Sequence, residues 1–163
     1  MLIRLVLRSW RDCILFFTLW HAKKATYVIF FASPCQFIDS WLSFFHFFID
    51  LRAISIAEST DYGVLRMIVD DAAKASNILL QHGDILSMTP VWAVEVPDRP
   101  GGLAEVLSVL ADAHVDVEYM YSLFTHRDGC AYMVLRISDE AAFLKATENS
   151  DIRLVGSAEL GIA

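Results

Sequence analysis

The chain has 163 residues, with 20 acidic and 13 basic side chains and a formal net charge of −7. This length suits one ordinary domain or two small ones. The negative charge argues against nucleic-acid binding, which needs a basic surface. The cysteines, Cys13, Cys35 and Cys130, are widely spaced and odd in number. This excludes a disulfide scaffold and a paired-cysteine zinc site, so we expect a cytoplasmic protein.

The composition changes sharply near residue 50. Residues 1–50 hold 13 of the 20 aromatic residues and no glycine, whereas residues 51–163 hold all seven glycines. Near the N-terminus, residues 13–20 form an apolar run. This run is too short to cross a bilayer, because a spanning helix needs about 20 apolar residues. We expect residues 1–25 to form an N-terminal extension with little order.

Residues 26–49 raise a second membrane question, because they are rich in Phe, Ile and Leu and carry one charge, Asp39. Inserting an aspartate costs about 2.5–3.5 kcal/mol, while each Phe or Leu returns about 0.3–0.6 kcal/mol. These contributions nearly cancel, so hydropathy leaves open a membrane-associated form that uses residues 1–49. A further alternative is that residues 1–48 are a mistaken reading frame, since they lack glycine.

An internal repeat indicates how the chain is organised. Residues 25–57 match residues 91–123 at a constant offset of 66, and the Val-Leu-Arg sequence that ends at Arg66 recurs at Arg136. Because residues 37–48 keep this offset with the second repeat, we expect them to form a packing helix and not a membrane helix. The chain therefore divides into the extension, residues 1–25, a first repeat, residues 26–90, and a second repeat, residues 91–163.

Each repeat has the pattern β-α-β-β-α-β. In the first repeat, the predicted strands are residues 27–32, 51–57, 64–69 and 85–88, and the predicted helices are residues 37–48 and a segment from Asp70 or Asp71 to Gly83. In the second repeat, the predicted strands are residues 93–96, 115–124, 131–137 and 152–155, and the helices begin near Leu103 and after Asp139.

This element order predicts an α+β, ferredoxin-like fold in two tandem repeats, each an antiparallel sheet with its helices on one face. A link over residues 87–91 joins the repeats. It is too short for a flexible hinge, so we expect the two units to be held against each other.

The loop between the first strand and first helix of the second repeat has the composition of a ligand site. Glycines at Gly101 and Gly102 let a ligand approach the backbone. Their N–H groups lie at a helix start, which favours a carboxylate. Asp98 can accept hydrogen bonds from an α-amino group. A free amino acid needs this pairing, although a Pro-Gly-Gly sequence can also be only a tight turn.

The segment from Glu95 to Val106 resembles the signature of the ACT domain family of small-molecule sensors. The resemblance continues in residues 115–121, in their counterpart at residues 49–58, and in residues 62–71. Over residues 27–160 the chain is similar to stand-alone tandem ACT proteins. The resemblance implies that an amino acid binds at this loop, between adjoining domains.

The candidate ligand-binding residues are the loop residues and three residues of a facing strand: Asp98, Arg99, Pro100, Gly101, Gly102, Leu103, Tyr119, Met120 and Tyr121. Alternation places Tyr119 and Tyr121 on one face, where packing within the sheet is the alternative role. The equivalent loop of the first repeat, residues 32–37, lacks the acid and both glycines. We therefore expect that loop to be structural or altered in specificity.

Other chemistry is sparse in the sequence. The five histidines show no metal-ligand spacing, and neither a nucleophile elbow nor a phosphate loop is present. We expect Arg66 and Arg136 to pair with acidic surface groups. The sequence thus predicts a non-enzymatic sensor with no catalytic residue, metal or cofactor.

The expected ligand is a free amino acid or a related small carboxylate. The expected partners are a second copy, because sheet edges need cover, and an enzyme of an amino-acid pathway or another regulator. A membrane is not an expected partner. The alternative is a regulatory subunit that binds its enzyme constitutively and needs no ligand.

Overall fold

The computed structural model of the chain describes residues 24–32, 48–58 and 63–162. The strands are β1 (Lys24–Ala32), β2 (Leu51–Glu58), β3 (Gly63–Val69), β4 (Ile85–Pro97), β5 (Val117–Arg127), β6 (Cys130–Ile137) and β7 (Leu154–Val155). The helices are α2 (Ala72–His82), α3 (Gly102–Asp112) and α4 (Glu140–Glu148). The predicted helix at residues 37–48 and most of the predicted N-terminal extension lie outside the described residues.

Local sequence signals set most of the element ends. Asp71 caps α2 by accepting the N–H of Lys74, and Gly83 ends it in the left-handed conformation, as predicted. Asp139 caps α4 by accepting the N–H of Ala142 at 3.0 Å. Gly129 supplies the positive φ of 75° in the turn between β5 and β6. Short polar and glycine residues thus fix these ends through their own chemistry.

The strand β4 differs from the sequence prediction. The predicted strands at residues 85–88 and 93–96, and the link at residues 87–91, form one 13-residue strand in the structure. Its first part pairs with β1 from Ile85 to Trp92, and its second part pairs with β6 from Trp92 to Pro97. Residues 90 and 91, the predicted boundary between the two repeats, both lie inside this strand.

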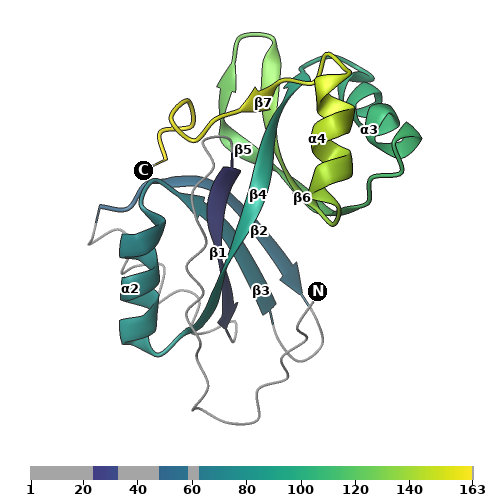
Figure 1. The fold of residues 1–163 in the computed structure, drawn as a ribbon. Coiled ribbons are helices and arrows are strands. Elements are labelled where there is room, and N and C mark those ends of the chain that lie inside the picture. The colour runs from purple at the N-terminus through teal and green to yellow at the C-terminus, as the bar shows by residue number, and fades with distance from the viewer. Residues whose placement is uncertain (1–23, 33–47, 59–62, 163) are drawn as a thin grey trace.

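The sheet has the order β2-β3-β1-β4-β6-β5, with β7 also paired to β4, and every pairing is antiparallel. Each half has the ferredoxin-like strand order, which confirms the predicted fold class. The last strand, β7, is shorter than the predicted residues 152–155. Figure 1 shows β4 running through both halves, with α2 on one side and α3 and α4 on the other.

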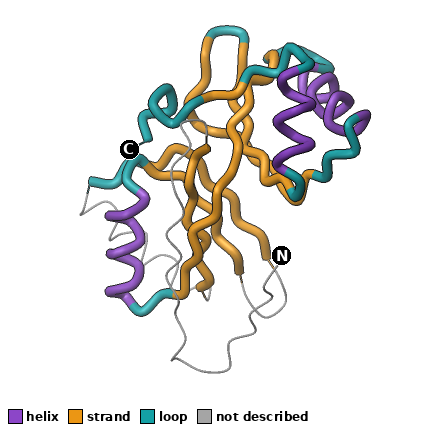
Figure 2. Tube along the Cα trace, in the orientation of Figure 1, coloured by secondary structure: helices purple, strands orange, loops and turns teal. Residues whose placement is uncertain are grey.

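Two helix-covered faces enclose separate cores. The buried residues Leu65, Met67 and Val69 of β3 pack against Ala75 and Leu79 of α2. In the second half, alternate residues of β4 and β6 pack against α3 and α4, and Phe143 and Trp92 contact each other with ring centroids 5.3 Å apart. Figure 2 shows the strands between these two helical groups.

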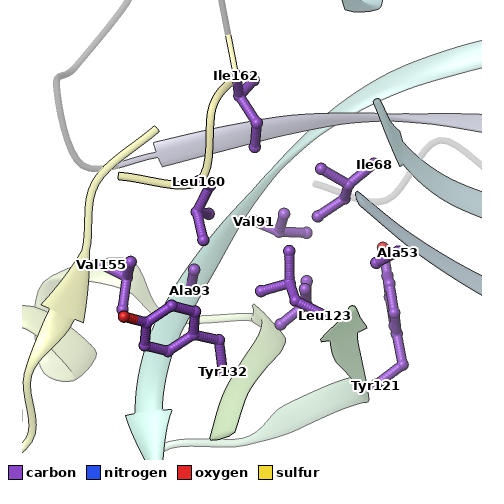
Figure 3. Close-up of a cluster of buried hydrophobic side chains, with 11 residues drawn as sticks. Ala53, Ile68, Val91, Ala93, Tyr121, Leu123, Tyr132, Val155, Leu160 and Ile162 are labelled. Carbon is purple, nitrogen blue, oxygen red and sulfur yellow. The ribbon is translucent and has the colours of Figure 1, made fainter. Parts of the chain in front are cut away.

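The opposite faces of the two halves pack on each other in a third core, which we call the β/β core. It contains Ala53 and Ile68 from the first half and Tyr121, Leu123 and Val134 from the second. The C-terminal segment after β7 completes it, with Leu160 and Ile162 pointing into the cluster (Figure 3). Arg52 of β2 donates to the carbonyl of Gly161, which fastens this segment to the first half.

In the described part of the chain, no helix is long and apolar enough to span a membrane. The membrane-associated alternative rests largely on residues that lie outside the described ranges.

Phe143→Ala should lower the free energy of unfolding by about 3–5 kcal/mol, because Phe143 is fully buried beside Trp92 and its removal leaves a cavity. The measurement is urea unfolding of the full chain. Phe124→Ala is the matched control, since Phe124 is 57% exposed and its loss should cost about 0.5 kcal/mol. Equal losses in the two variants would contradict the assignment of Phe143 to the core.

Candidate functional site

The loop from Asp98 to Gly102 joins the end of β4 to the start of α3. Two backbone hydrogen bonds hold its first half, from the N–H of Asp98 to the carbonyl of Gly129 and from the N–H of Arg99 to the carbonyl of Pro97, both at 2.9 Å. The first of these fastens the loop to the turn between β5 and β6. The loop is therefore anchored to two elements of the second half.

The structure requires glycine at Gly101 and at Gly102 for two different reasons. Gly101 adopts φ of 87°, in the left-handed region that side chains disfavour, but open space surrounds the position of a Cβ. Gly102 is buried, and a Cβ there would overlap the carbonyl oxygen of Pro97. One glycine is needed for its φ angle and the other for a close backbone approach.

The first turn of α3 leaves backbone N–H groups without an intrahelical acceptor. Gly101 is the N-cap and has no side chain to accept from the first turn. The N–H of Gly102 donates to the carbonyl of Arg99 at 3.0 Å. The next two, those of Leu103 and Ala104, have no intrahelical acceptor because they belong to the first turn of the helix. These donors lie at the positive end of the helix dipole, which favours an anion.

The charged residues of the loop are exposed and differ in their partners. Arg99 forms a 2.7 Å ion pair with Glu105 in the first turn of α3. Exposed pairs of this kind are worth little, so a ligand carboxylate can compete for the guanidinium. The Asp98 side chain is exposed and forms no hydrogen bond or ion pair with the described residues. Its carboxylate is thus accessible to a cationic group.

The three candidate residues of β5 lie away from this loop. Tyr119 and Tyr121 share a face, as alternation predicted, and that face packs in the β/β core. Met120 lies on the other face and is 39% exposed. The strand advances about 3.3 Å per residue, which places Tyr121 about 20 Å along β5 from Arg127 beside the loop. Within one chain, the structure brings together the loop residues but not the three β5 residues.

A polar network that the sequence did not reveal lies just before the loop on β4. Glu95 pairs with Arg127 at 2.8 Å and with Arg153 at 2.7 Å. Arg153 also pairs with Glu159 at 2.7 Å, and the Tyr132 hydroxyl donates to the same carboxylate. The network ties β4 to the turn between β5 and β6 and to the C-terminal segment. The alternation of Glu95 between Val94 and Val96 indicated its face, but nothing local indicated its partners.

The network shifts two acid groups in opposite directions. Hydrogen bonding from Arg153, with a smaller contribution from Tyr132, holds the pKa of Glu159 below its ordinary value. The bond to Glu159 and burial raise the pKa of the Tyr132 phenol. Hydrogen bonds to Glu159 and Glu95 raise the pKa of Arg153. These shifts follow from hydrogen bonds and charge pairing within the network and, for Tyr132, from burial.

A shallow depression of about 370 Å³ lies elsewhere, between α3 and α4. Its lining is Ala113, Ala142, Lys145, Ala146 and Asn149, none of which belongs to the loop. Within residues 24–32, 48–58 and 63–162, no group of three or more His, Cys, Asp or Glu side chains is placed to hold a metal ion.

The fold and the loop define a tandem pair of ferredoxin-like units, one of which carries a glycine loop at a helix start. The family model of the ACT domain pair matches residues 43–149. The chain belongs to this family, whose domains are typically ligand-binding regulatory domains. No curated protein matches the sequence.

Solved structures share the fold. The crystal structure of protein BT0572 from Bacteroides thetaiotaomicron is 29% identical, with a TM-score of 0.78, over 86% of this chain and 97% of that chain. The regulatory subunit of aspartate kinase from Thermus thermophilus, in a ligand-free form, is 13% identical, with a TM-score of 0.56, over 80% and 94% of the two chains. At 13% identity, the likeness to the aspartate kinase subunit shows the fold alone.

Gly102→Ala should destabilise the protein more than Gly101→Ala. The first places a methyl group against the Pro97 carbonyl, at an overpacking cost of about 2–3 kcal/mol, whereas the second strains only its own φ, at about 1 kcal/mol. Chemical unfolding of both variants beside the wild type measures the difference. The reverse order would show that the close approach of Gly102 to Pro97 does not constrain the loop.

Glu159→Gln should destabilise the protein at pH 7, and its difference from the wild type should shrink toward pH 3. Glu159 has a lowered pKa in the folded chain, so its stabilisation is present above the ordinary glutamate pKa and is lost as the pH falls through the folded value. Urea unfolding of both proteins across this range measures the effect. A difference that stays constant with pH would contradict the pairing with Arg153.

Proposed function

We propose that this chain is a regulatory sensor that binds a free amino acid, or a related small carboxylate, at the loop from Asp98 to Leu103. The observation that carries the proposal is the juxtaposition of opposite groups at one helix start. The N–H groups of Leu103 and Ala104 favour a carboxylate, and the exposed Asp98 carboxylate suits an ammonium group.

The loop geometry supports a ligand that lies against the backbone. Gly101 keeps the space beside the helix start open, since a Cβ there would meet nothing within 4 Å. Pro100 and Gly102 fix the loop on either side of it, and Leu103 follows as a half-buried apolar contact. Arg99 would release its ion pair with Glu105 and bind the ligand carboxylate instead.

The regulatory part of the proposal rests on the family. We extend to this chain a role like that of a regulatory subunit, acting in the cytoplasm on an enzyme of an amino-acid pathway or on another regulator, without catalysis of its own. A second copy of the chain would cover the edge strands β2 and β5, which end the sheet. We assign Tyr119 and Tyr121 mainly to packing in the β/β core, while Met120 remains available at the surface.

The proposed mechanism is a shift between arrangements of the assembled chains. A ligand changes that equilibrium only if it binds one arrangement more tightly than the other. The loop is anchored to both β4 and the turn between β5 and β6. A ligand at the helix start would therefore act on two elements of the second half together.

Asp98→Asn should weaken amino-acid binding roughly 10- to 100-fold, because it removes a charged acceptor for the ligand's ammonium group. The measurement is calorimetry of the full chain with each of the twenty amino acids. The matched control is Asp112→Asn, which removes an exposed carboxylate at the other end of α3 and should leave binding unchanged.

Two results would contradict the proposal. If no amino acid gives a heat of binding with the wild type, the sensor role is wrong and the constitutive regulatory subunit is favoured. If an amino acid binds but Asp98→Asn and Asp112→Asn bind it equally, the ligand lies away from this loop.

A further inference from the structure

Two arginines at equivalent positions of the repeats lie on the faces that form the β/β core. Arg66 of β3 alternates with Leu65 and Met67, which face α2, and so shares the face of Ile68. Arg136 of β6 likewise shares the face of Val134. Each half therefore contributes one arginine to the region between the two halves of the sheet.

Arg136 is partly satisfied by protein groups. Its Nη1 donates to the carbonyl of Pro90 at 3.0 Å, and its Nε lies 3.7 Å from a carboxylate oxygen of Glu118. The expected acidic partner is thus present for Arg136, at a distance too long for a strong hydrogen bond. Within the described residues, these contacts leave N–H donors of the Arg136 guanidinium for a further acceptor.

Arg66 has a different environment, and the expected acidic partner is absent among the described residues. Its guanidinium carbon lies 4.3 Å from the ring centroid of Tyr119. Its Nε is buried and has no hydrogen-bond acceptor in the described part of the chain. A cation–π contact contributes about 0.5–2 kcal/mol, whereas a buried donor left without an acceptor costs about 1–3 kcal/mol. The stacking contact alone does not satisfy this side chain.

Tyr119 links the two arginines. It is the register partner of Arg136 across β5 and β6, and its ring lies beneath Arg66. We propose that Arg66 and Arg136 together bind a small oxyanion, a carboxylate or a phosphate group, between the two halves at Tyr119. Planar guanidinium groups match the paired oxygens of such anions, and stacking on Tyr119 orients one of them in advance.

This oxyanion site is separate from the loop. Tyr119 lies about 26 Å along β5 from Arg127, beside the loop, so one small ligand does not reach both. Because each half supplies one arginine, an anion bound here would resist separation of the halves and stabilise the folded chain by mass action. The inference therefore goes beyond the proposed function and does not depend on it.

The test is calorimetry of the full chain with inorganic phosphate and, separately, with succinate, in chloride buffer at constant ionic strength. We expect one of the two anions to bind. The anion that binds shows whether the site accepts a phosphate group or a carboxylate. Arg66→Gln and Arg136→Gln should each weaken binding at least tenfold. Arg127→Gln is the control, because it removes one positive charge near the loop and should bind like the wild type.

Arg66→Lys provides a second variant in case Arg66→Gln does not fold. It keeps a cation near Tyr119 but loses the planar fork, so binding should weaken about tenfold. Absence of binding by both anions at millimolar concentration would overturn the proposal. Binding that Arg66→Gln or Arg66→Lys leaves unchanged would overturn it as well, whereas Asp98→Asn should have no effect on this site.

Discussion

A single continuous strand, β4, determines how the two repeats meet. Its first part pairs with β1 and its second part pairs with β6. The short strand β7 pairs with the second part on the edge opposite β6. The strand β4 also contributes Val91 and Ala93 to the β/β core, where the helix-free faces of the two halves pack on each other. Pro90 lies in this strand although it has no N–H. Its carbonyl points toward Arg136 of β6, and the N–H of the same residue would point to that edge as well. The pairing with β6 begins only at Trp92, so no hydrogen bond to β6 is lost at Pro90.

The same strand positions the loop. Glu95, two residues before the end of β4, binds Arg127 and Arg153 and so holds the neighbouring turn and the C-terminal segment in place. The chain then leaves the strand at Pro97, and the close approach of Gly102 to Pro97 fixes the start of α3. The helix start and the exposed Asp98 thus lie beside the contacts that hold the turn, the C-terminal segment and Pro97 in place. Such preorganisation lowers the cost of ordering a small ligand.

Features with local causes were predictable from the sequence, and features that depend on distant contacts were not. Asp71, Gly83 and Asp139 mark helix ends through their own caps, and the glycine loop signals a backbone approach. The fusion of residues 85–97 was missed because Pro90 and the polar residues before it have the composition of a break. The partners of Glu95 and the stacking of Arg66 on Tyr119 depend on residues from other strands, which no local pattern contains.

Backbone amide NMR of the full chain can map where a bound amino acid lies. An amino acid that binds should shift the amide signals of the loop most strongly, at Asp98, Gly101, Gly102 and Leu103. Smaller changes are expected at Gly129, whose carbonyl accepts from the loop. Shifts concentrated at the depression between α3 and α4, with the loop signals unmoved, would contradict this prediction.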